Sequence, residues 1–300
     1  MGALDAAFPP AMFSNPSVRS AAVVAAVVAV ACAPVGVFTV MRGQSFAGHA
    51  FADITATGGS AAFLLGLSPL VGFAAITLVG GGAMELLGTE HRRGRDLATG
   101  IVLGSGLGLS ALLLYLTTTT QSSSGAAVTV LFGSIFAVSP GALPLVAGLG
   151  GAALALVGLM YRPLLLSSVS PALVATQGPP RRAAGFAYTA SLALSVALAA
   201  ITIGAILSTA LLVGPAAAAL RFARSPGRAV AWAAVIGTVV TWVGIVLAYD
   251  SYTWPPAGRG WPVSFFVVCL VVVAYLLSHL RRRPRRERGA EELQGRRGRA

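Results

Sequence analysis

The sequence predicts an all-α protein that crosses a membrane many times. Of its 300 residues, 56% are hydrophobic and only 10% are charged, and the mean hydropathy is +0.82. Soluble domains carry about 25% charged residues, so this composition excludes an ordinary soluble fold. Apolar stretches close to the roughly 20-residue length of a spanning helix recur along the chain, separated by turn residues and charges.

Nine stretches have the length and composition of spanning helices. Residues 185–220 form one apolar run broken at Thr202 and Gly204, which fits either a tight helical hairpin or a single broken helix. The uncharged run from Thr117 to Ser124 is expected to be an exposed linker. Gly104, Gly106 and Gly108 in the fourth helix predict close packing against a neighbour. The nine predicted helices are 18–40, 44–66, 69–88, 97–119, 141–160, 185–202, 204–220, 229–249 and 262–280.

All 21 basic residues are arginines, and their positions predict which side of the membrane each loop occupies. Four clusters fall on the same side of the nine-helix order, and short loops rich in arginine stay in the cytoplasm. We therefore expect a multi-pass plasma-membrane protein with its N-terminus outside, its C-terminus in the cytoplasm and no nucleic-acid partner. The clusters are Arg92, Arg93 and Arg95; Arg162, Arg181 and Arg182; Arg221, Arg224 and Arg228; and nine arginines after residue 280.

The chain divides into residues 1–280, which are expected to form one transmembrane domain, and a basic tail at 281–300. The tail has no hydrophobic periodicity and is expected to be disordered in the cytoplasm. It either binds anionic membrane lipid or only fixes the topology. With no lysine in the chain, a phosphate-binding loop is absent, and no catalytic set of residues is recognisable. The sequence thus predicts a protein that is not an enzyme.

His49 and Asp53 are an ionisable pair inside a predicted span. They are four positions apart, so a helix places both side chains on one face, one turn apart. Ionisable groups inside spans are costly and mark functional sites by default. An imidazole nitrogen and a carboxylate oxygen suit zinc, manganese or iron better than magnesium or calcium. A buried His–Asp hydrogen bond that only stabilises the helices fits the same spacing.

Four stretches of the chain carry a family likeness through their order and spacing. They are 45–53 (Ser-Phe-Ala-Gly-His-Ala-Phe-Ala-Asp) followed by Gly58; 95–101 (Arg-Asp-Leu-Ala-Thr-Gly-Ile); 131–140 (Leu-Phe-Gly-Ser-Ile-Phe-Ala-Val-Ser-Pro); and 161–219, which holds 170–178 and 210–219. From about Arg42 to about Leu280 the sequence resembles the membrane-spanning permeases of ATP-driven zinc, manganese and iron importers.

The chain departs from that family's pattern at three positions. The family has an Asp with a His four residues later, whereas this chain has His49 and then Asp53. Ser134 replaces an acidic residue, and Gly214 stands near a position for a larger apolar residue. On a helix the exchanged pair still presents one nitrogen and one oxygen one turn apart.

The resemblance implies a fold like that of the type II ABC importers and a transport function. It implies a homodimer around a central path, a cytoplasmic ABC ATPase subunit, and an extracytoplasmic metal-binding protein that delivers a divalent metal ion. His49 and Asp53 would contact this transported ion, and no permanently bound cofactor is expected. The segment matching the family's ATPase-coupling region could also be an ordinary polar loop. The coupling residues expected there are Ser170, Pro171, Leu173, Val174, Gln177 and Gly178.

Two other functions also fit the residues. A permease of the same architecture could carry a chelated metal or cofactor, in which case His49 and Asp53 would be structural. An ion-coupled secondary transporter would instead use Asp53 as a proton carrier and would need no ATPase.

Overall fold

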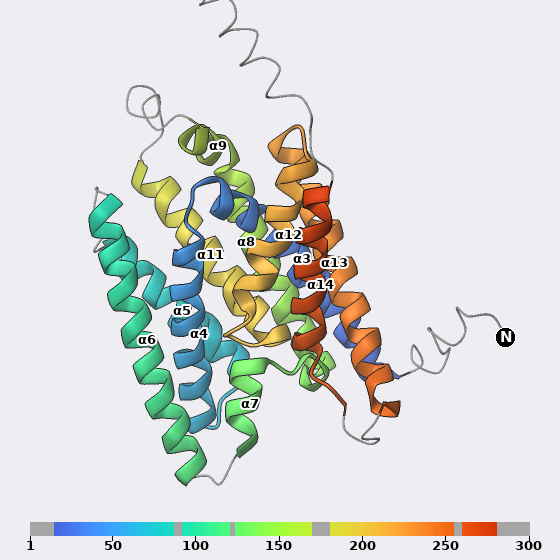
Figure 1. Cartoon of the computed structure of the whole chain (residues 1–300). Coiled ribbons are helices and arrows are strands. Elements are labelled where there is room, and N and C mark those ends of the chain that lie inside the picture. Colours follow the sequence, from blue (N-terminus) through green and yellow to red (C-terminus); the bar gives the residue numbers. More distant parts are fainter. Residues whose placement is uncertain (1–14, 87–91, 121–123, 170–180, 255–259, 281–300) are drawn as a thin grey trace, which may run out of the picture.

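The structure is a computed structural model of the chain, and it describes residues 15–86, 92–120, 124–169, 181–254 and 260–280. All regular structure in these ranges is helical (Figure 1). Short 3-10 turns lie at Ile135–Ala137, Pro140–Ala142 and Ser251–Thr253. The α-helices are α3 (Pro16–Met41), α4 (Ser45–Leu64), α5 (Pro69–Leu86), α6 (Arg92–Thr120), α7 (Ser124–Phe132), α8 (Leu143–Leu159), α9 (Tyr161–Val169), α11 (Arg181–Ile203), α12 (Ser208–Phe222), α13 (Pro226–Asp250) and α14 (Val263–Leu280).

Each of the nine predicted stretches corresponds to one of these helices, so the all-α membrane fold is confirmed. Six described helices are long and apolar enough to cross a membrane, and α5 and α12 are shorter apolar helices. Helix α4 belongs to neither group: it carries His49, Asp53 and several hydroxyl groups, and most of it is buried among other helices. Helices α7 and α9 were not predicted, because each has nine residues and is too short to span.

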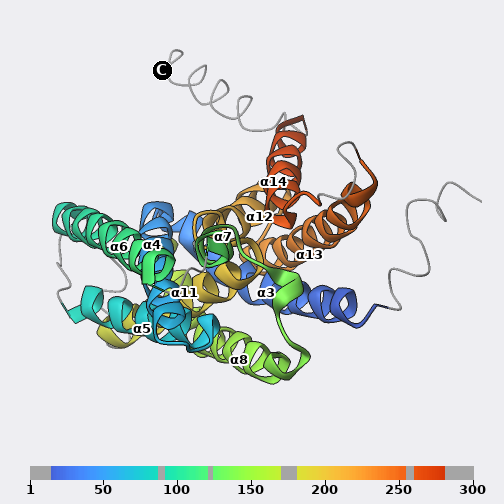
Figure 2. The same ribbon diagram turned by 90° about the horizontal axis from the view of Figure 1, so that it is seen from below.

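Helix α3 packs against α8, α11, α12 and α13 and is buried along most of its length. It begins at Pro16, and Asn15 is its N-cap residue. The Asn15 side chain accepts a hydrogen bond from the Ser17 amide at 3.0 Å, and proline is well suited to the first helical position. Seen along the helices, α6 lies at one edge of the bundle and α13 and α14 at the other, with α4, α11 and α12 between them (Figure 2).

Contacts with α3 show that α11 and α12 form a helical hairpin. The Thr39 hydroxyl lies 2.9 Å from the Tyr188 hydroxyl, so α11 begins beside the end of α3. Trp242 donates from Nε1 to the Ala22 carbonyl at 2.9 Å, so α13 runs antiparallel to α3 and also begins at that end. Since α12 ends just before α13 begins, it runs back along the direction opposite to α11. Of the two arrangements that fit the apolar run 185–220, the structure has the hairpin.

Two glycines close the tip of this hairpin against the end of α7. Gly204 has φ +85° and Gly133 has φ +75°, a left-handed conformation that glycine adopts without strain. A Cβ on either residue would overlap the backbone of the other segment. The Ala205 amide donates to the Val130 carbonyl at 3.0 Å. Backbone contact of this kind leaves no room for side chains, so the hairpin tip has a fixed position against the end of α7.

Most helix ends that bear arginines gather at one end of the bundle, the upper end in Figure 1, whereas Arg19 lies at the other end, near the start of α3. Arg42 follows α3, Arg162 lies in α9, Arg221 ends α12, and Arg228 lies in the first turn of α13. Helices α6 and α11 also start at this end, with Arg92 and Arg181 as their first residues. The predicted grouping of the arginines is therefore found, and the assignment of this end to the cytoplasm stays a prediction.

The predicted linker at 117–124 was wrong for its first part, because α6 continues through Thr120. The threonine hydroxyls bond within the helix: Thr117 donates to the Leu113 carbonyl at 2.8 Å and Thr120 to the Leu116 carbonyl at 2.6 Å. A hydroxyl satisfied in this way can remain in an apolar helix. Residues 121–123 lie outside the described ranges, as does the tail at 281–300.

Candidate functional site

The start of α4 is fixed by a short turn that leaves α3. The Arg42 amide donates to the Phe38 carbonyl at 2.9 Å, and Gly43 follows with φ +65°. The Arg42 guanidinium lies 4.6 Å from the centre of the Tyr188 ring on α11, and Tyr188 is buried. The turn that leads into α4 is therefore attached to both α3 and α11.

One face of α4 packs on α5 at backbone distance. Gly58 and Gly72 face each other so closely that a Cβ on either would overlap the other's carbonyl group. Beside them the hydroxyls of Thr55 and Thr77 lie 2.7 Å apart, and both side chains are buried. Small residues that bring helices together and hydroxyls that bond across them are the usual means of packing helices in membranes.

A second face of α4 packs on α6 beside Asp53. A Cβ on Gly106 would lie 3.1 Å from the Asp53 carbonyl carbon and 3.1 Å from the Ile54 nitrogen. Thr57 donates from Oγ1 to the Gly106 carbonyl at 2.8 Å. The predicted close packing of glycines in α6 is thus found at Gly106. A Cβ added to Gly104 or Gly108 would have no described atom of another segment within 4 Å.

The remaining face of α4 carries both predicted metal ligands. Asp53 is the ninth of the helix's 20 residues and lies near its middle, and His49 lies one turn nearer its start. His49 is exposed, whereas Asp53 is only 7% exposed. Phe46, one turn before His49, is 54% exposed. We call Phe46, His49 and Asp53 the His49 face. Its side chains are exposed at Phe46 and His49 and buried at Asp53.

Within the described residues, no hydrogen bond or ion pair joins the His49 ring to the Asp53 carboxylate. The purely structural interpretation of the pair, a buried His–Asp hydrogen bond, is therefore not found. The same part of the chain contains no group of three or more His, Cys, Asp or Glu residues that could hold a metal ion. Among the described residues the pair thus offers one nitrogen ligand and one oxygen ligand.

The six residues predicted to couple to an ATPase, Ser170, Pro171, Leu173, Val174, Gln177 and Gly178, lie outside the described residues. Their flanks are described. Helix α9 ends at Val169 and α11 begins at Arg181, both at the arginine-bearing end of the bundle (Figure 1). The described flanks of the predicted segment therefore lie at the same end of the bundle.

Sequence reasoning missed the residues that hold α4 in place. Tyr188 on α11 bonds to Thr39 and lies against Arg42, although about 150 positions separate them. Glu85 at the end of α5 accepts a hydrogen bond from Thr189 at 3.1 Å, on the same turn of α11. Pairs so distant along the chain leave no periodic signal, so a single sequence could not have revealed them.

Curated proteins resemble the chain over most of its length. It is 27% identical over 232 residues to the manganese import system permease protein ScaB of Streptococcus parasanguinis, covering 77% of this chain and 81% of the relative. It is 29% identical over 227 residues to the high-affinity zinc uptake system membrane protein ZnuB of Haemophilus influenzae, covering 74% and 85%. It is 27% identical to the manganese transport system membrane protein MntC of Halalkalibacterium halodurans, covering 80% and 82%.

Two solved structures share the fold. PsaBC from Streptococcus pneumoniae in complex with Fab superposes with a TM-score of 0.79 at 24% identity, covering 95% of this chain and 99% of the other. An inward-facing conformation of a putative metal-chelate type ABC transporter superposes with a TM-score of 0.70 at 15% identity, covering 88% and 86%. At these identities the comparison shows a common helical architecture.

The family follows from the sequence match over nearly the whole chain. A model of the ABC 3 transport family matches residues 14–281, which include every described helix. This range also holds the four stretches on which the resemblance was first drawn. The chain belongs to the ABC 3 transport family.

Proposed function

We propose that this chain is the membrane permease subunit of an ATP-driven importer that moves a divalent metal ion, with His49 and Asp53 contacting the ion. The observation that carries the proposal is the His49 face of α4. It presents an imidazole and a carboxylate one turn apart inside a membrane protein of the ABC 3 transport family. Relatives in this family are named for manganese and for zinc, which both accept nitrogen and oxygen ligands.

The partial burial of the pair supports a transient ion contact. Two protein ligands are too few for a closed structural metal site, which usually has four. A transport path needs weak binding, because the ion must also leave. Because α4 starts at the arginine-bearing end, an ion that enters from the opposite end would meet Asp53 near the middle of α4 first and exposed His49 afterwards.

A second copy of the chain would complete the path. The His49 face lies between the face of α4 that packs on α6 and the face where Gly48 meets Leu212 of α12. Exposed ionisable groups on a central helix have to face water or protein, because lipid would not solvate them. A homodimer with the two His49 faces turned toward each other would place four ligands around one path.

The binding sites of the two expected partners depend on which side of the membrane the arginine-bearing end faces. If that end faces the cytoplasm, residues 170–178 form the contact with a separate ABC ATPase, and the opposite end receives an extracytoplasmic metal-binding protein. Closure of the ATPase would then move α9 and α11, and α11 contacts the start of α4 through Tyr188. Transport would follow by opening the path to one side at a time.

Metal uptake tests the role of the His49 face. The chain would be expressed with its ATPase and binding protein, and uptake of radioactive manganese and zinc measured. The double substitution His49→Ala with Asp53→Ala should reduce uptake to the background of cells without the chain. The matched control changes His279→Ala, which is the same residue type as His49 but lies outside α4, and should leave uptake unchanged. Undiminished uptake in the first variant, at equal amounts in the membrane, would refute the assignment.

Two arms of the same assay separate the other functions. Uptake of a metal chelate in preference to the free ion would indicate the chelate permease, and then His49 and Asp53 would be structural. Uptake that continues when ATP hydrolysis is blocked by vanadate would indicate an ion-coupled transporter.

The double substitution Leu173→Ala with Gln177→Ala tests the ATPase-coupling segment. ATP hydrolysis should continue, and the number of ions transported per ATP should fall. An unchanged number of ions per ATP would remove this segment from the mechanism.

A further inference from the structure

The outer side of α13 carries a shallow hollow with an arginine at one end. The hollow encloses about 200 Å³ and is lined by Arg228, Ala231, Trp232 and Val235. Arg228 lies in the first turn of α13, at the arginine-bearing end of the bundle, and Arg224 four positions earlier is also exposed. Trp232 is 46% exposed. Tryptophan beside arginine is typical of the boundary between the membrane core and its headgroups.

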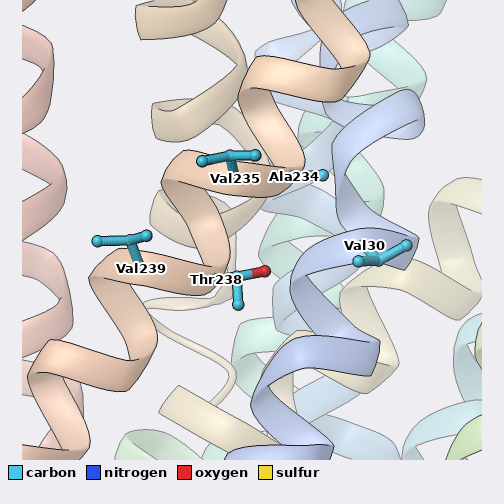
Figure 3. A pocket seen from close by; sticks show the side chains of 5 residues that line it. All are labelled: Val30, Ala234, Val235, Thr238 and Val239. Atoms are coloured by element: carbon cyan, nitrogen blue, oxygen red, sulfur yellow. The ribbon is translucent and has the colours of Figure 1, made fainter.

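A second hollow continues from the first toward the middle of the membrane. It encloses about 260 Å³ and lies between α13 and α3, with Val235 common to both hollows. Figure 3 shows the residues that line it: Ala234, Val235, Thr238 and Val239 on α13, and Val30 on the neighbouring α3. Val30 is 42% exposed and Val239 is 52% exposed, so this hollow is open to the surroundings. The two hollows together form what we call the α13 furrow.

The furrow has the dimensions and the polarity of a lipid. From Arg228 to Val239 the helix rises by about 16 Å, which is half of the roughly 30 Å membrane core and hence the depth of one leaflet. One end presents a guanidinium group, and apolar side chains line the remainder apart from Thr238. An acyl chain would match the apolar part, and a phosphate would match Arg228. A zwitterionic headgroup would match it less well, because its own amine competes for the phosphate.

We propose that the α13 furrow binds one anionic glycerophospholipid of the leaflet at the arginine-bearing end, with its phosphate on Arg228 and one acyl chain between Val30 and Val239. In a membrane, apolar contact alone gives little preference, because acyl chains are available everywhere. Selectivity therefore comes from the arginine. One basic residue near the surface contributes about 1 kcal/mol toward anionic lipid, which is roughly a fivefold change in affinity.

Native mass spectrometry of the full chain in detergent tests this site. Phosphatidylglycerol and phosphatidylcholine of equal chain length are titrated, and the retained lipids are counted. We expect Arg228→Gln to weaken phosphatidylglycerol binding about fivefold and to leave phosphatidylcholine unchanged. Val235→Trp fills the furrow and should weaken both lipids. The matched control Arg162→Gln removes an exposed arginine from α9 at the same end and should change neither. Thermal unfolding of each variant checks that the fold is retained.

Three results would each overturn the lipid site in the furrow. Equal losses in the Arg228 and Arg162 variants would mean that lipid is attracted to the basic surface as a whole. Displacement of the lipid by inorganic phosphate or by headgroup alone would mean that the acyl chain is not held. Unchanged lipid retention in Val235→Trp, with a change only in the number of chains per particle, would make the furrow an interface between copies.

Discussion

At the scale of single residues, the chain has to keep an aspartate near the middle of a helix within the membrane. Asp53 is 7% exposed, and among the described residues its carboxylate interacts electrostatically with His49. A largely buried carboxylate is costly in a membrane unless polar or charged groups stabilise it. The exposed imidazole one turn away points to a cation shared between the two groups rather than to a hydrogen bond within the helix.

The order of the two ligands can be reversed without moving the helix. We expect His49→Asp combined with Asp53→His to restore metal uptake of the same order of magnitude as the parent, because the pair still offers nitrogen and oxygen on one face. The preference between manganese and zinc should change, since the ligand nearer the open end changes type. Competition between the two ions in the uptake assay measures this preference. Uptake as low as in the double alanine variant would show that the order of ligands itself is required.

At the scale of elements, hydropathy located the long helices but not the short ones. The nine spans appear because about 20 apolar residues must stand together to cross a membrane. Helix α7 gave no such signal because it has only nine residues, and α9 gave none because it is equally short and holds Arg162 and Pro163. The hydroxyl-rich end of α6 was read as a loop because threonine is a weak helix former in water. In an apolar helix its hydroxyl bonds to the preceding turn, which removes that disadvantage.

The site was predictable in part for the same physical reason. A four-residue spacing fixes two side chains on one helix face, so the placement of His49 and Asp53 on α4 could be derived. Which neighbour covers which face depends on packing between distant segments. The contact of Thr57 with Gly106, and that of Thr55 with Thr77, could not be derived from spacing.

Replacing glycine by alanine at two positions, Gly58 in α4 and Gly104 in α6, tests how closely these helices pack on their neighbours. Gly58→Ala should destabilise the fold by about 1–3 kcal/mol, because the new methyl group would overlap the Gly72 backbone. Gly104→Ala has open space and should stabilise the helix by about 0.5–1 kcal/mol. Unfolding of the two variants in a detergent titration measures both changes. Shifts of equal sign and size would contradict the close approach of α4 and α5.

At the scale of the whole molecule, the charge distribution and the helix order agree. The whole chain carries a net charge of +12. Most arginines of the described residues lie at one end of the bundle, where seven of the described helices start or end next to an arginine or carry one (Figure 1). The same end holds the flanks of residues 170–178. The side of the membrane that this end faces therefore determines three things together: the side of the N-terminus, the side of the proposed ATPase contact and the leaflet of the proposed lipid.

Labelling of single cysteines tests that assignment. In a Cys269→Ser background, Cys32 is buried and should not react. A membrane-impermeant maleimide should label Thr253→Cys in intact cells, because Thr253 is exposed at the end opposite the arginines. Ser225→Cys, between α12 and α13, should react only after the cells are made permeable. The reverse pattern would place the arginines outside and exclude residues 170–178 as an ATPase contact.

The hairpin of α11 and α12 has a consequence for how the chain enters the membrane during synthesis. With 15 residues, α12 is about 22 Å long, which is shorter than the membrane core. Such a segment is a poor substrate for insertion by itself, and the turn before it holds only four residues, so it can reach its depth only against an α11 that is already in place. The short α12 therefore predicts that α11 and α12 enter the membrane as a pair, joined by the turn that begins at Gly204.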